Sequence, residues 1–499
     1  MKKFLSTFPA PALALLVSSS TVAQIAPSGE LDTDLYYKWR QREKARSPGG
    51  FDYQLAPYVI DTDSLNGSLF PYWSASPNSL RWYAAPGESF LSQRSRRSSA
   101  QERLRGGMSV ALSSRVFAQS SFVVDESLAD DPLYTGKIWR GLAGDVETAV
   151  MSYSSEKLTA LFGRFRGAWG PALTNTLLSQ EARPLDGLSF RYRLSGKFTF
   201  SYQLARLDGL SPDDPNDTLS VFVKRYFAAH RIDLRPHHSL RLGVFESVIF
   251  AGPGRGLELQ FLNPLIFFHA NQLNEANNDN TFLGFDFDWW PGARFNLYGQ
   301  LLVDDFQIEK KTQGDQEPNE IGWIVGAHLV DMRPGWDVRF QWDRVTNRTY
   351  NQKLPRNRYL NQNQPLGHPL GNDFELFQAH LSRWWGATRM LRFSGLWRRS
   401  GEGGVRKPWT EPWLQVSGAY SEPFPSGVVE RQATVQLELQ TLVPRSESSL
   451  SNSNSRFKLR ATVGWSDFAN EGNIPGADRS GLFANVGVTF FIAGDWRLD

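Results

Sequence analysis

The chain of 499 residues contains no cysteine. This absence excludes disulfide bonds, thiolate metal sites, cysteine nucleophiles and cysteine-ligated iron–sulfur clusters. Charged residues make up only 21% of the sequence, and 54 Lys and Arg nearly balance 51 Asp and Glu. Such a composition excludes a disordered polyelectrolyte and a basic nucleic-acid binder, so no nucleic-acid partner is expected.

Long apolar runs are also scarce. Beyond residue 23, the best candidate for a membrane helix covers residues 257–270, but Glu258 and Pro264 interrupt it. Near the N-terminus, two lysines precede a mostly apolar stretch that ends in small residues. This pattern predicts a signal peptide over residues 1–23 and therefore export, with an uncleaved membrane anchor as the alternative.

Aromatic residues, by contrast, are abundant, with 34 Phe, 17 Trp and 15 Tyr. They recur in two-residue alternation with polar residues, as in residues 337–343, where Val338, Phe340 and Trp342 alternate with charged or amide side chains. The same alternation covers residues 283–289, 434–440 and 457–465. It predicts β-strands with one apolar and one polar face, as found in both soluble sandwiches and membrane barrels.

Three features favour a membrane barrel over a sandwich. The alternating segments are long, tryptophans lie at strand ends as in Trp289-Trp290 and Trp384-Trp385, and tight turns alternate with long polar stretches such as residues 347–373. In hydrocarbon, strands satisfy all their backbone groups only in a closed barrel.

We therefore predict an all-β fold, a transmembrane antiparallel β-barrel in the bacterial outer membrane. Residues 105–499, at roughly 22 residues per strand with its share of loop, give about 18 strands. This location implies contact with outer-membrane lipid, and with the barrel-assembly machinery during insertion.

Residues 24–104 show a different pattern. Helical spacing of apolar residues predicts a helix over residues 31–46 and a second over residues 77–97, which ends in the basic group Arg94, Arg96 and Arg97. We expect this basic group to be a solvated helix end. The segment is predicted to cap or plug the barrel from the periplasmic side.

Signatures of catalysis are absent from the sequence. It has no Gly-x-Ser-x-Gly, His-Glu-x-x-His or phosphate-binding P-loop motif, and its seven histidines are scattered. Asp304 and Asp305 are adjacent carboxylates, but neighbouring strand residues face opposite sides, so they form no dyad without a bulge. No catalytic residue, metal or cofactor is therefore predicted.

Polar side chains are concentrated in a few stretches, above all in residues 271–280, which hold five asparagines. Amide groups both donate and accept hydrogen bonds without net charge, which suits sugar hydroxyls, and tryptophan rings can stack on pyranose rings. A plain polar loop is the alternative. The candidate polysaccharide-binding residues are Arg164, Arg166, Trp169, Glu181, Arg183, Arg191, Glu246, Arg255, Asn271, Gln272, Asn274, Asn278 and His368.

Short motifs in a fixed order resemble one known family. Residues 162–171 read FGRFRGAWGP and residues 178–184 read LSQEARP; GVFES at 243–247, Asn263-Pro264 and LGHPLG at 366–371 follow. In this order they resemble the capsule assembly Wzi family. The resemblance implies an outer-membrane barrel of about 18 strands with a small helical N-terminal part, acting as a lectin that helps attach capsular polysaccharide to the cell surface.

The expected function is thus non-catalytic binding of capsular or exported polysaccharide. Two alternatives remain at this point. One is a porin-like channel for small solutes. The other is an outer-membrane hydrolase of lipid or protein that would use Asp304, Asp305 and His368.

Overall fold

The computed structural model describes residues 79–93, 96–113, 115–210, 222–275, 278–308, 312–386, 388–444 and 456–497. The predicted signal peptide and the helix predicted over residues 31–46 lie outside these residues. Within them, no helix is long and apolar enough to cross a membrane.

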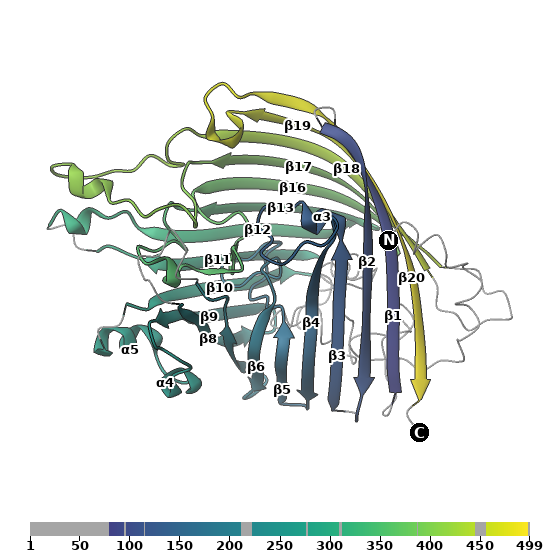
Figure 1. Ribbon diagram of the computed structural model, residues 1–499, viewed down its shortest axis with the longest axis horizontal. Helices are drawn as coiled ribbons and strands as arrows, with labels where there is room; N and C mark the ends of the chain where they lie inside the picture. The colour runs from purple at the N-terminus through teal and green to yellow at the C-terminus, as the bar shows by residue number, and fades with distance from the viewer. Residues whose placement is uncertain are drawn as a thin grey trace.

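Eighteen strands form one closed antiparallel meander (Figure 1). Each strand pairs with its neighbours in sequence, and β1 also pairs with β20, so that Ser79 lies opposite both Ala111 and Arg497. The predicted barrel and its strand number are confirmed. The strands are β1 (Ser79–Gln93), β2 (Arg96–Ala111), β3 (Val116–Asp125), β4 (Ala143–Ser154), β5 (Leu158–Phe165), β6 (Leu185–Arg193), β7 (Phe198–Arg206), β8 (Lys224–His237), β9 (Leu240–Gly252), β10 (Asn280–Gly292), β11 (Phe295–Asp305), β12 (Glu320–Arg333), β13 (Trp336–Val345), β16 (Phe374–Trp385), β17 (Arg389–Ser400), β18 (Glu430–Pro444), β19 (Arg456–Ala469) and β20 (Arg479–Arg497).

The helix predicted over residues 77–97 is wrong, because β1 occupies Ser79–Gln93. The barrel therefore begins about 25 residues before the predicted boundary at residue 105. Tyr83 and Ala85 are buried against Phe491 of β20, with the rings of Tyr83 and Phe491 stacked at 5.7 Å. Pairing with a neighbour on each side overrides the local helical spacing.

The outward face of the wall is mainly apolar, and its inward face carries many polar side chains. On β13, Phe340 is 56% exposed while Asp343 is completely buried, and the two alternate along one strand. A soluble sandwich would bury Phe340 instead. Exposed apolar side chains recur on the outward face of every part of the barrel, as lipid-facing residues of a membrane barrel do.

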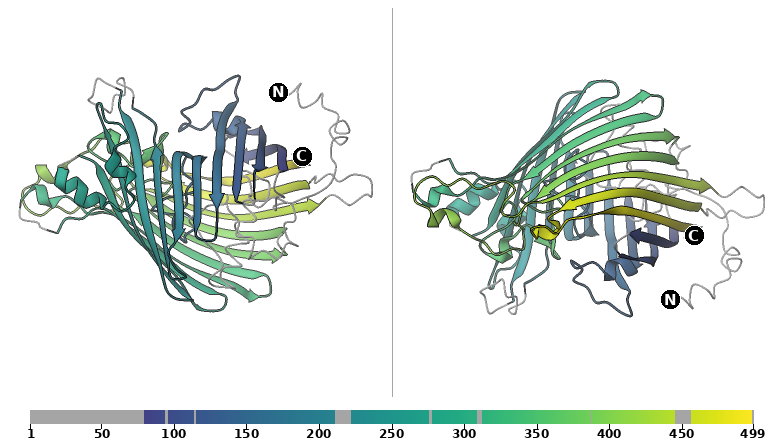
Figure 2. Two further views of the ribbon diagram at one scale, coloured as in Figure 1. Left: turned by 90° about the horizontal axis from the view of Figure 1, so that it is seen from below. Right: turned by 90° about the horizontal axis from the view of Figure 1, so that it is seen from above.

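The two ends of the barrel differ in their connections (Figures 1 and 2). At one end most turns are short, such as residues 155–157, 238–239 and 334–335. At the other end, long loops follow β3, β5, β7, β9, β11, β13 and β17. Short turns are typical of the periplasmic end and long loops of the outside, so both ends of the described barrel, Ser79 and Arg497, lie on the periplasmic side.

Within the part of the chain that the structure describes, the helices and the minor strands lie in the outer loops. They are α3 (Glu126–Ala129), α4 (Leu259–Leu262), α5 (Phe268–Glu275), the 3-10 turns η3 (Gly314–Gln316), η4 (Pro355–Asn357), η5 (Pro412–Gln415) and η6 (Glu471–Asn473), and the two-residue strands β14 (Leu360–Asn361) and β15 (Gln364–Pro365).

Candidate functional site

Two of the outer loops fold back into the barrel. The first inward loop, residues 166–184, joins β5 to β6, and the second inward loop, residues 346–373, joins β13 to β16. Their buried residues Trp169, Leu177 and Tyr359 belong to one apolar cluster with inward-facing residues of the wall. The barrel therefore encloses a packed core where the two inward loops enter it.

Hydrogen bonds join the two inward loops directly. The hydroxyls of Tyr350 and Tyr359 donate to the carbonyls of Thr176 (2.6 Å) and Leu177 (2.7 Å). The amide of Ser179 donates to the carbonyl of Leu366 at 2.8 Å. Burial raises the pKa of both tyrosines, so their hydroxyls stay protonated and continue to donate.

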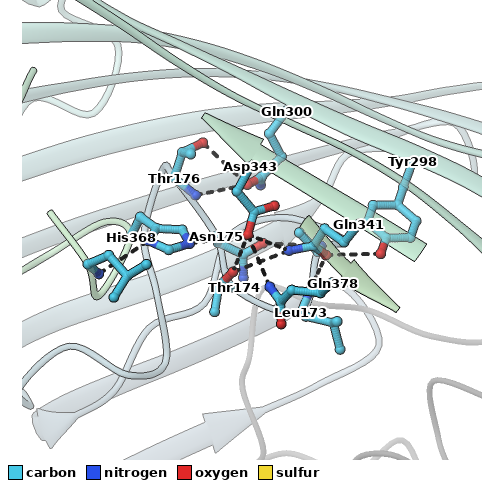
Figure 3. Close-up of polar contacts among 12 residues, drawn as sticks. Leu173, Thr174, Asn175, Thr176, Tyr298, Gln300, Gln341, Asp343, His368 and Gln378 are labelled. Atoms are coloured by element: carbon cyan, nitrogen blue, oxygen red, sulfur yellow. Dashed lines mark hydrogen bonds and ion pairs between the residues drawn. The ribbon is translucent and has the colours of Figure 1, made fainter. Parts of the chain in front are cut away.

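The first inward loop is also bonded to the wall through amide side chains (Figure 3). Gln300 of β11 accepts from the amide of Thr176 at 2.9 Å and donates to the carbonyl of Trp169 at 3.0 Å. Gln341 of β13 accepts from the amide of Leu173 at 2.9 Å. Each wall glutamine thus satisfies backbone groups that the loop carries into the lumen.

Asp343 connects both inward loops to the wall (Figure 3). Its Oδ2 atom accepts from Thr174 of the first loop at 3.3 Å and from Gln378 of β16 at 3.2 Å. His368 of the second loop places Nε2 at 3.3 Å from the same atom. The two loops and the wall therefore form one hydrogen-bonded plug.

A third loop, residues 401–429 between β17 and β18, covers the outer side of this plug. Arg348 of the second inward loop makes two bonds to Glu422, at 2.8 and 2.7 Å. The carboxylate of Asp373 accepts from the amides of Gly403 (2.8 Å) and Ser426 (2.9 Å). At the outer mouth, the second inward loop and the third loop are thus bonded to each other.

Several predicted binding residues instead hold the first inward loop in place. Trp169 is 1% exposed and lies edge-on to Phe245 at 5.3 Å, so its ring offers no free face to a sugar. Arg166 donates to the carbonyl of Ala182 at 2.7 Å. Arg183 is buried and pairs with Asp131 at 3.1 Å. Arg164 of β5, by contrast, pairs with Asp186 of β6 at 2.6 Å on the outward face of the wall.

Glu246 faces away from the lumen, although it was expected to line it. It lies opposite Leu283, which is on the outer face of β10. Its carboxylate accepts from the backbone amides of Phe268 (3.1 Å) and His269 (3.0 Å) at the start of α5, and contacts the rings of His230 (3.0 Å) and His269 (2.7 Å). Glu246 therefore caps a helix that lies against the outside of the barrel.

The asparagine-rich stretch forms much of this external helix. Gln272 donates to the carbonyl of Asp279 at 2.5 Å, and Arg255 pairs with Glu258 at 2.6 Å and with Asp279. Asn271 is half-buried in α5, whereas Asn274 and Asn278 are exposed.

The remaining predicted residues are scattered. Glu181 is exposed on the first inward loop, Arg191 lies half-buried on β6, and His368 is buried in the plug. The structure therefore does not bring the thirteen predicted residues into one pocket. It assigns most of them to the packing of the outer loops.

Asp304, Asp305 and His368, which the hydrolase alternative would use, do not form a catalytic site either. A bulge does separate Val303 from Asp305, but Asp304 accepts from the amide of Tyr350 at 2.6 Å. Both ring nitrogens of His368 are occupied, one by Asp343 and the other by the amide of Leu370. Among the described residues, no group of three or more His, Asp or Glu could hold a metal ion.

Five residues that bond the inward loops to each other and to the wall were not predicted from the sequence: Gln300, Gln341, Asp343, Tyr350 and Tyr359. The wall residues carried a signal, because an amide or carboxylate on the inward face of a barrel strand needs a buried partner. The partners themselves lie in loops more than a hundred residues away.

Comparison with known proteins agrees with this architecture. Residues 87–462 match the model of the family described as capsule assembly protein Wzi. No curated protein sequence matches the chain significantly.

Among solved structures, Wzi of Escherichia coli superposes with a TM-score of 0.57 at 12% identity, covering 94% of this chain and 99% of that chain. It is described as an outer-membrane protein involved in group 1 capsule assembly and as a carbohydrate-binding β-barrel. OccD3 (OpdP) of Pseudomonas aeruginosa aligns over 83% of this chain and 91% of that chain, at 10% identity and a TM-score of 0.45. The barrel is that of an outer-membrane protein, and because the family match spans most of its length, the chain belongs to the capsule assembly protein Wzi family.

Proposed function

We propose that this barrel binds capsular or exported polysaccharide at its outer face and helps to attach or assemble it there, without catalysis. The observation that carries the proposal is the plug, in which two inward loops are bonded to each other and to the wall. Such a barrel presents a rigid outer surface to a partner, and the E. coli Wzi barrel is described as carbohydrate-binding.

The outer loops offer suitable groups for a polymer of sugars. Trp139, in the loop between β3 and β4, is 62% exposed, and the guanidinium of Arg140 lies 5.0 Å from its ring centre. An exposed indole can stack on a pyranose ring, and a neighbouring arginine can pair with an acidic sugar. Asn274 and Asn278 add exposed amides elsewhere on the outer loops.

Binding would rest on many modest contacts repeated along the polymer. A single exposed stacking or hydrogen-bonding contact contributes little by itself, but a long chain engages several sites at once, and avidity raises its retention. The expected partner is therefore a polysaccharide rather than a monosaccharide.

The test compares cells with and without the protein. Deletion is expected to release capsule or exopolysaccharide into the medium while synthesis continues, and W139A is expected to weaken retention without changing the amount of barrel in the membrane. R115A, which alters a periplasmic turn, serves as the control. Unchanged retention, together with no binding of native glycan to the purified barrel, would contradict the proposal.

A further inference from the structure

One sector of the outer wall, from β12 to β18, carries an aromatic row. Trp342 of β13, Phe377 of β16 and Trp397 of β17 lie opposite one another in register and face outward. The rings of Trp342 and Phe377 stack at 5.7 Å, and Phe377 packs on Trp397 at 5.5 Å. Figure 1 shows these strands side by side. The row lies near the outer ends of the strands, where aromatic residues meet the membrane interface.

An apolar groove runs along this row on the lipid-facing wall. Its volume is about 570 Å³, within the range of small-molecule sites, and aromatic side chains including Phe340 and Trp465 border it. Small residues on adjacent strands leave it open, among them Ala327, Ala379 and Gly395. A Cβ atom added at Gly395 would meet no atom within 4 Å.

Just beyond the aromatic row, towards the outer loops, the wall becomes basic. Arg344, Glu375, Arg399 and Arg431 face outward in register on β13, β16, β17 and β18. Glu375 lies 4.0 Å from Arg344 and 3.3 Å from Arg399, so the row has three guanidinium groups and one carboxylate. On β19 the residue opposite Arg431 is Ala469, so the basic row ends at β18.

Aromatic rings hold two of these arginines at the level of the membrane interface. The guanidinium of Arg344 lies 5.1 Å from the ring centre of Trp323, and that of Arg399 lies 6.0 Å from Trp397. Their side chains remain 29% and 30% exposed. The guanidinium of Arg344 also lies 3.7 Å from the ring centre of Phe424, and Arg399 donates to the carbonyl of Phe424 at 2.8 Å. Arg431 is exposed. Arg431 is thus the most accessible of the three cations, whereas Arg344 and Arg399 are partly covered.

We infer that this sector binds one phosphorylated, acylated lipid of the outer leaflet, with an acyl chain in the groove and a phosphate on the arginines. The guanidinium group of an arginine can pair with two phosphate oxygens through two parallel hydrogen bonds. A purely apolar groove would accept any hydrocarbon chain, so the selectivity must come from the basic row above it. The order of groove, aromatic row and arginines along the strands matches the order of acyl chain, interface and headgroup in a lipid.

The inference can be tested with the full mature barrel purified in detergent. Native mass spectrometry would count bound lipid after addition of hexa-acylated, bis-phosphorylated lipid A, and then of the same lipid with its phosphates removed. The phosphorylated lipid is expected to remain on the barrel at roughly tenfold lower concentration than the dephosphorylated one. R344Q/R431Q, which keeps the Arg399–Glu375 pair, is expected to abolish that difference.

Two alanines provide a matched test of the groove. Ala379 lines it, whereas Ala461 also faces outward, on β19, but lies outside it. A379L is expected to reduce retention of both lipids several-fold, and A461L to leave it unchanged. Heat-modifiable migration on gels would show that each variant is folded.

Three outcomes would overturn the inference: equal retention of both lipids by the unmodified barrel, equal behaviour of A379L and A461L, or a lipid-free dimer that the A379L substitution disrupts. The first two would mean nonspecific boundary lipid. The third would mean that a second copy of the chain covers the groove.

Discussion

Glu246 shows how one side chain can fix an element that the barrel itself does not need. A carboxylate on the lipid-facing wall is costly, because hydrocarbon does not solvate a charge. Here α5 supplies two backbone amides and His269, while His230 approaches from β8. The external helix is thus attached to the barrel by a charge that would otherwise be unsatisfied.

Replacing Glu246 by alanine should therefore loosen α5 without unfolding the barrel. Loss of the buried, charge-assisted bonds is expected to lower the free energy of local opening of residues 257–275 by about 2 kcal/mol. Their amide hydrogen exchange would then be roughly thirtyfold faster. N274A, which changes an exposed residue of the same helix, should leave exchange unchanged. Equal exchange in E246A and the unmodified protein would show that apolar packing alone holds the helix.

A second residue makes the stability of an outer loop depend on pH. Burial, with the nearby charge of Asp305, raises the pKa of Glu317 in the loop between β11 and β12 from 4.5 to about 7. The folded loop therefore binds this proton more tightly than the unfolded chain does. Its contribution to stability is complete below pH 4.5 and is lost as the pH rises through 7.

Between pH 5 and pH 8, the loop around Glu317 should lose about 1–3 kcal/mol of local stability. Hydrogen exchange of residues 312–320 at the two pH values, corrected for intrinsic rates, measures this loss. E317Q should remove the pH dependence, whereas E181Q, a change at an exposed carboxylate, should preserve it. A pH dependence that survives in E317Q would assign it to another group.

At the scale of elements, the inward loops decide whether the barrel conducts. Gln300 satisfies the buried amide of Thr176 and the buried carbonyl of Trp169 at once. Q300A leaves both unpaired, at a cost of about 2–3 kcal/mol. In planar bilayers we expect the unmodified barrel to be silent and Q300A to open intermittently.

Removal of residues 168–182 should give a steady pore. Q436A, a substitution on the inward face of β18, serves as the control for Q300A and should stay silent. Steady conductance by the unmodified barrel would favour the channel alternative over a plugged binding protein.

The strands could be predicted from the sequence because lipid and lumen impose opposite polarity on neighbouring residues. Val338, Phe340 and Trp342 face outward, as their alternation indicated. Residues 77–97 were assigned wrongly because β1 is defined by its pairing with β2 and β20, which local spacing does not reveal.

The outer-loop contacts could not be predicted for a related reason. Trp169 and Glu246 were selected for their chemical type, but whether a tryptophan is free or buried depends on loops distant in sequence. The faces of strands are a local property, whereas the conformations of long loops are not.

At the scale of the whole molecule, the function proposed here depends on closure of the wall. β20 pairs with β19 on one side and with β1 on the other, and it joins the end of the described chain to its beginning. Without it, β1 and β19 would expose rows of unpaired backbone groups to hydrocarbon, each costing several kcal/mol. A chain ending at residue 478 is therefore expected to fail to insert into liposomes and to lose heat-modifiable migration. A full-length chain carrying V486A and V488A keeps the pairing but trims the lipid-facing side chains, so it should still insert. Insertion of the truncated chain would mean that the sheet can close without β20, and that the β1–β20 pairing is not required for the barrel.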